Sequence, residues 1–151
     1  MSWSNSIRGL LAGAFLTSCA SPALEVPVGL RDTGVGYRDR DEAAKAACKL
    51  IWDQIPRAKR YEYCGILFSH GEGEIRISVP KTDNKESGCT PPVPPSDLIL
   101  LGRYHNHRLT PEPSPPDRRI AERYPQLGHY VCAPSGIVRR FSLQEGTVIV
   151  R

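Results

Sequence analysis

The stretch "GRYHNHRLTPEPSPPD" (residues 102–117) places two of the four histidines of the chain two residues apart, near the end of an apolar run. Such a run predicts a strand that is buried on both faces and whose polar end opens into a site. Side chains two apart on a strand point to the same side, with Cα atoms roughly 6.6 Å apart. His105 and His107 can therefore face one ion, and Asp117 can supply a third ligand. Catalytic zinc uses three such ligands and keeps a fourth position open for water.

The same residues also have a simpler structural interpretation. "SPPD" (114–117) is a favourable helix start, with a serine as N-cap, a proline at the first helical position and a carboxylate three residues after the cap. Taken alone, Ser114 and Asp117 favour capping. His105 and His107 can equally be partly buried polar residues at a strand end. The residues by themselves leave both interpretations open.

The remaining pattern predicts an α/β (α+β) domain over residues 39–151. Apolar positions in residues 41–55 form one helical stripe, which Asp41 can cap and Pro56 ends. Residues 61–68 and 74–79 predict a hairpin, residues 97–107 a strand, and residues 114–124 a short helix. Short strands follow to the end of the chain. We expect a mixed, largely antiparallel sheet flanked by helices.

The N-terminal residues predict export and lipidation. Residues 1–18 carry one positive charge and a short apolar run, as in a secretory signal peptide. The run ends in "LTSC" (16–19), which resembles the lipobox of bacterial lipoproteins, so Cys19 is expected to be acylated and residues 19–38 to form a tether. Ala20 follows the cysteine, which favours the outer over the inner membrane, and we expect the lipoprotein to face the periplasm. The alternative is an ordinary cleaved signal peptide with an incidental Cys19.

Composition excludes some partners. The 20 Lys and Arg residues and 16 Asp and Glu residues give a net charge of +4, and the basic residues are scattered, so we expect no nucleic acid as partner. Four further cysteines allow three disulfide pairings, and none has the spacing of a thiolate zinc site. These cysteines are Cys48, Cys64, Cys89 and Cys132. A Cys64 or Cys132 nucleophile is a remote alternative.

Two motifs together resemble the JAB/MPN (JAMM) metalloproteases. That family carries a glutamate on a strand, then His-x-His, a spacer and Ser-x-x-Asp. Here these are Glu62 in "YEYCGILF", "HNH" (105–107) and "SPPD" (114–117). Residues 41–143 are similar to a bacterial branch of uncharacterised JAB-like domains, some of them attached to secreted toxins. The spacer of six residues is one shorter than in the family enzymes, and Asn106 and Arg108 replace their usual residues.

The resemblance implies a JAB/MPN-like, cytidine-deaminase-like fold and a reaction. His105, His107 and Asp117 would hold Zn²⁺, Glu62 would act as general base, and Ser114 would donate to the oxyanion. The expected reaction is hydrolysis of a peptide or isopeptide amide, with a peptide or protein of the cell envelope as substrate. A toxin or secretion system is a possible partner. The alternatives are a JAB-like binding module without activity, and a structural lipoprotein or immunity-type partner that binds no metal.

Overall fold

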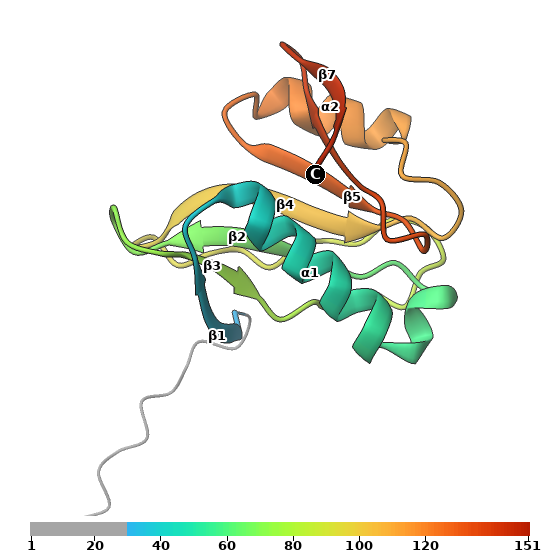
Figure 1. Cartoon of the computed structure of the whole chain (residues 1–151), viewed down its shortest axis with the longest axis horizontal. Coiled ribbons are helices and arrows are strands. Elements are labelled where there is room, and N and C mark those ends of the chain that lie inside the picture. Colours follow the sequence, from blue (N-terminus) through green and yellow to red (C-terminus); the bar gives the residue numbers. More distant parts are fainter. Residues whose placement is uncertain (1–29) are drawn as a thin grey trace, which may run out of the picture.

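The strands form one mixed sheet in the computed structural model, which describes residues 30–151 (Figure 1). They are β1 (Asp32–Tyr37), β2 (Cys64–Ser69), β3 (Ile75–Ser78), β4 (Ile99–Asn106), β5 (Gly128–Cys132), β6 (Val138–Ser142) and β7 (Gly146–Ile149). Their order is β1-β3-β2-β4-β5-β6-β7, and β4–β5 is the parallel pair among antiparallel neighbours. The predicted α+β class with a largely antiparallel sheet is confirmed.

The first strand of the sheet, β1, begins earlier in the chain than the sequence predicts. Residues 32–37, which were expected to belong to the tether, form β1 and pair antiparallel with β3. A register shift between Asp32 and Gly36, with Gly34 at a positive φ of 79°, breaks the two-residue alternation that marks a strand. The folded domain therefore includes β1. The predicted signal peptide and Cys19 lie outside the described residues.

Helix α1 (Arg40–Gln54) lies across the sheet and ends before Pro56 as expected (Figure 1). Its cap is Asp39 and not Asp41, because the Asp39 carboxylate accepts hydrogen bonds from the backbone N–H groups of residues 41 and 42. Asp41 instead binds Tyr130 and Arg140 on the sheet, at 2.7 and 2.9 Å. A 3₁₀ helix, η1 (Pro56–Lys59), follows. In the described chain no helix has the length and apolarity to cross a membrane.

The core lies between α1 and one face of the sheet. The helix buries Ala43, Ala44, Ala47, Cys48 and Ile51. These side chains pack against Tyr104 and Tyr130, and a disulfide joins Cys48 to Cys132. A second disulfide joins Cys64 to Cys89. One of the three pairings left open is thus present, and because Cys64 and Cys132 are both bonded, the cysteine-nucleophile alternative is wrong.

Strand β4 separates the core from the candidate site. Tyr104 and Asn106 are fully buried, whereas Arg103 and His105, which alternate with them, are half-buried. Because side chains alternate along a strand, the first pair faces α1 and the second pair faces the opposite side of the sheet. Helix α2 (Pro115–Arg123) supplies Asp117 to that opposite side. The sheet thus has a packed face and a face that carries the site.

Asn106 holds the segment before β2 against β4. Its side-chain oxygen accepts a hydrogen bond from the N–H of Tyr63 at 2.6 Å. Its amide nitrogen donates to the carbonyls of Ala58 and Tyr61, at 3.0 and 3.3 Å. The backbone N–H of Asn106 also donates to the Tyr63 carbonyl. These bonds fix both neighbours of Glu62, so one buried amide positions that carboxylate beside the histidines.

We predict that Asn106→Ala lowers the free energy of unfolding by on the order of 3 kcal/mol, because it leaves buried backbone groups unpaired. Urea unfolding followed by circular dichroism measures the change. Gln126→Ala removes an exposed amide and serves as the control, with an expected change within about 0.5 kcal/mol. Equal effects of the two substitutions would contradict the role of Asn106.

Candidate metal centre

Two histidine rings meet at the end of β4. The Nε2 atoms of His105 and His107 lie 3.0 Å apart, and both side chains are mostly buried. Two unprotonated ring nitrogens at this distance would turn their lone pairs toward each other. The pair therefore needs either a proton between the rings or a cation beside them.

Helix α2 brings a carboxylate to the same point. Asp117 Oδ1 lies 3.3 Å from Nε2 of His105, and Oδ2 lies 3.3 Å from Nε2 of His107. The predicted capping is also present: Ser114 N–H donates to Asp117 Oδ2, and Asp117 N–H donates to Ser114 Oγ. The Ser114 hydroxyl donates to Asp117 Oδ2 at 2.6 Å. Asp117 thus completes the capping box of α2, in which Ser114 is the N-cap, and its carboxylate also faces the histidines.

His105, His107 and Asp117 could hold a metal ion. One ligand atom from each lies within 4.8 Å of the others. Around a tetrahedral ion with bonds of about 2.0–2.1 Å, two ligand atoms are about 3.3 Å apart. The two histidine nitrogens are 3.0 Å apart, and each lies 3.3 Å from a different oxygen of Asp117, so the nitrogen–nitrogen and nitrogen–oxygen separations are close to the edge length of such a site.

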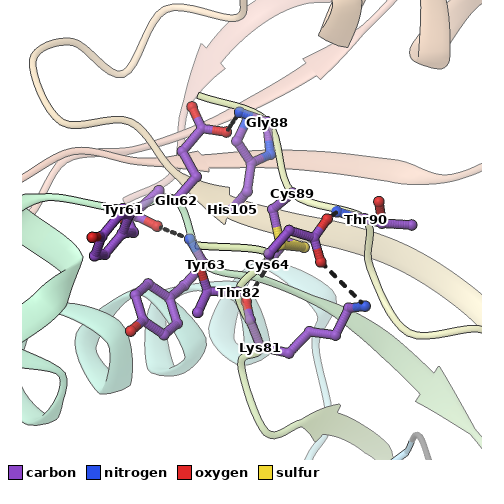
Figure 2. Close-up of a disulfide and its surroundings, with 12 residues drawn as sticks. Tyr61, Glu62, Tyr63, Cys64, Lys81, Thr82, Gly88, Cys89, Thr90 and His105 are labelled. Carbon is purple, nitrogen blue, oxygen red and sulfur yellow. Dashed lines mark hydrogen bonds and ion pairs between the residues drawn. A yellow bond between two sulfur atoms is a disulfide. The ribbon is translucent and has the colours of Figure 1, made fainter. Parts of the chain in front are cut away.

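Glu62 lies beside this group, just before β2 and not within it. Its side chain is buried, and Oε1 is 3.9 Å from Nε2 of His107. Its other oxygen accepts a hydrogen bond from the N–H of Gly88 (Figure 2). The next residue, Cys89, is bonded to Cys64 at the start of β2. Figure 2 shows the disulfide next to Glu62 and His105, so a covalent link holds the loop that orients this carboxylate.

The charges of the group stabilise one another. Burial raises the pKa of Asp117, but hydrogen bonds from His105 and His107 outweigh burial and hold that pKa well below its usual range. Burial lowers the pKa of His107, but the hydrogen bond and charge of Asp117, together with the charge of Glu62, leave the pKa raised. Without a metal, the group therefore retains a proton on His107 to higher pH than an ordinary histidine. Metal binding has to displace that proton.

A cavity of about 350 Å³ connects this group with the middle of β4 and β5. Its lining includes Glu62, His105, His107, Ser114 and Asp117, so the structure brings together all the predicted site residues of the described chain. His129 also lines the cavity, and its Nε2 lies 3.2 Å from the Tyr124 carbonyl. The pKa of His129 is lowered, chiefly by burial.

The sequence interpretation missed Asn106, Gly88, Arg103 and His129 as residues around the site. The two-residue period of a strand could have indicated two of them. If His105 and His107 face the site, Arg103 faces it too, and Asn106 faces the core, where an amide must be hydrogen-bonded. Gly88 and His129 come from segments whose position depends on the tertiary fold.

Comparison with known proteins leaves the family open. No protein-family model matches the chain, and no curated protein matches it. The solution structure of protein DSY2949 from Desulfitobacterium hafniense is similar at 18% identity, over 70% of this chain and 86% of that one, with a TM-score of 0.45. The JAB/MPN resemblance therefore stays a prediction from the motifs.

We predict that the purified protein contains one metal ion per chain, and that a His105→Ala, His107→Ala double variant contains none. Mass spectrometry of protein prepared without nickel affinity resin measures the metal. His70→Ala, which changes an exposed histidine in the turn between β2 and β3, should keep the ion. Protein that takes up no divalent metal even when it is supplied would contradict this assignment.

Proposed function

We propose that the chain is a zinc-dependent hydrolase of peptide or isopeptide amides, of the JAB/MPN type. The observation that carries the proposal is the convergence of the two histidine rings and the Asp117 carboxylate. The buried carboxylate of Glu62 lies beside them, with its Oε1 3.9 Å from Nε2 of His107. Two nitrogen ligands and one oxygen ligand suit zinc in a catalytic site. Glu62 is outside the ligand group, as a proton-transfer residue should be.

Zinc held by His105, His107 and Asp117 would supply Lewis-acid chemistry that makes water acidic near neutral pH. Glu62 then accepts the proton of the attacking water and delivers it to the leaving amine. The hydrogen bond from Gly88 occupies Oε2 and leaves Oε1 on the side of His107. The carboxylate therefore has one oxygen for orientation and one for proton transfer.

Ser114 has two roles in this proposal. In the structure its hydroxyl donates to Asp117, which fixes the orientation of a ligand carboxylate. It also lines the cavity, so a rotation of the hydroxyl would allow it to donate to the developing oxyanion. The orienting role needs no change of conformation, and the oxyanion role needs that rotation.

The alternative is a JAB-like module that binds a metal and a partner without chemistry. The Ser114 hydroxyl donates to Asp117, so it is not free to donate to an oxyanion in the cavity, and this favours the binding module. Arg108, at the position of the usual family proline, does not decide between the two. It pairs with Glu86 at 3.5 Å and does not line the cavity. A structural lipoprotein or immunity-type partner, in contrast, would hold no metal.

We predict that Glu62→Gln lowers amide hydrolysis by at least about 10²-fold and leaves the zinc content unchanged, because it removes the proton acceptor but no ligand. Mass spectrometry of a mixture of peptides and Nε-linked isopeptides detects cleavage and identifies the substrate. Glu122→Gln, on the exposed side of α2, is the control. A zinc-loaded wild type that cleaves nothing in the mixture would favour the binding module.

We also propose that the protein is a lipoprotein of the outer membrane, anchored through Cys19. The proposal rests on the lipobox-like residues 16–19, and it places envelope peptides and proteins within reach of the site. We expect Cys19→Ser to move the protein from the membrane pellet to the soluble fraction of a double-membraned bacterial host and to abolish palmitate labelling. Ser18→Ala keeps a small residue before the cysteine and should leave both unchanged. A Cys19→Ser protein that still incorporates palmitate would rule out this anchor.

A further inference from the structure

The side chain of Arg103 lines the same cavity as the candidate metal centre. Arg103 is two residues before His105 on β4, so the two side chains share the face that bears the site. Its neighbour across the parallel pair is His129 on β5, which also lines the cavity. Among the described residues of the lining, Arg103 is the one lysine or arginine.

Arg103 has no acidic partner in the described chain. None of the ion pairs formed by residues 30–151 includes it, and its buried Nε makes no hydrogen bond. Its guanidinium lies over the ring of Tyr124, 5.0 Å from the centroid. Stacking of this kind engages the flat face of the guanidinium and leaves its edge N–H groups free to donate. The side chain is therefore held in place, and within residues 30–151 its terminal guanidinium nitrogens make no hydrogen bond, so they are the donors left for a ligand.

The carboxylates of the cavity form no ion pair with Arg103. These two carboxylates, Glu62 and Asp117, both belong to the metal centre, where the histidines and Gly88 engage them. The lining also includes apolar side chains, among them Ile120, Val131 and Phe141. A partly buried guanidinium with free donors beside apolar walls is matched by an anion, and a carboxylate fits its paired N–H groups.

We propose that Arg103 binds a free carboxylate of the substrate and so restricts the enzyme to amides that lie close to such a group. The Cα atoms of Arg103 and His105 are roughly 6.6 Å apart along the strand. An extended peptide advances about 3.3–3.6 Å per residue, so the carboxylate lies within about two residues of the amide that is cleaved. The substrate class is therefore short peptides with a free C-terminal carboxylate, or N-acyl amino acids, in either case with an apolar side chain. The cleavage part rests on the proposed function, whereas the carboxylate site does not.

The test compares two ligands that differ only in the carboxylate. N-acetylphenylalanine and N-acetylphenylalaninamide are titrated into the purified protein, and ¹⁵N NMR gives each dissociation constant and the residues affected. We expect the acid to bind at least tenfold more tightly than the amide, with shifts at residues 103 and 129. Arg103→Met, which keeps the aliphatic stem, should bind both ligands equally, and Arg103→Lys should retain part of the preference.

Two controls separate this site from the metal centre. Arg119→Met removes an exposed arginine of α2 and should keep the preference of the wild type. The His105→Ala, His107→Ala variant should keep it too, because the metal is not the binding group. Equal binding of the two ligands by the wild type, a preference that survives in Arg103→Met, or a preference lost with the histidines would each overturn the proposal.

Turnover separates the failure of this proposal from that of the proposed function. For a cleaved peptide, Arg103→Met should raise KM at least tenfold for the form with a free C-terminal carboxylate and leave KM for the amidated form unchanged. Absence of cleavage with an Arg103-dependent preference in binding would refute the hydrolase and keep the carboxylate site. Cleavage without any effect of the carboxylate would keep the hydrolase and refute the carboxylate site.

Discussion

The two-residue period of β4 is the constraint on which the site depends. It sends Arg103 and His105 to one face of the sheet and Tyr104 and Asn106 to the other. A strand that carries polar ligands on one face buries less apolar surface there than an apolar strand and so contributes less to packing. Here the loss is limited because α1 covers the opposite face with a full core, and because the Asn106 side chain on that face makes hydrogen bonds to three backbone groups.

Two local devices complete the site from segments distant in sequence. The capping box of α2 fixes Asp117 through Ser114, so the hydrogen bonds that begin the helix also orient the ligand carboxylate. The Cys64–Cys89 disulfide fixes the loop that donates the Gly88 N–H to Glu62. Both devices act on carboxylates, which are the groups that lose most free energy if they are buried without hydrogen bonds. The hydrogen bonds that stabilise these buried carboxylates therefore also hold them in position for the site.

The sequence predicted those parts whose signal is local. Helix α1, the β2–β3 hairpin, β4 and the capped start of α2 follow from periodicity and capping. The spacing of His105, His107 and Asp117 made them candidate ligands, and the motif resemblance favoured that interpretation over the structural one. Strand β1 was missed because its register shift removes the alternation, and Asp39 was missed as a cap because Asp41 has the same chemistry. The disulfide pairing and the positions of Gly88 and His129 depend on which segments become neighbours, which local pattern does not encode.

The pKa values of the cluster relate the fold to the metal. Asp117 has a pKa below the ordinary value of 3.8, so its stabilising contribution is present above that pH and is lost as pH falls through the folded pKa. His107 has a pKa above 6.5, so its contribution is present below 6.5 and is lost as pH rises through the folded pKa. Between these values the metal-free cluster is held together by a proton. Above the folded pKa of His107 that proton leaves, and three adjacent ligand atoms remain without a cation between them. A metal ion then restores the missing charge, so the geometry that holds a proton below the folded pKa of His107 favours metal binding above it.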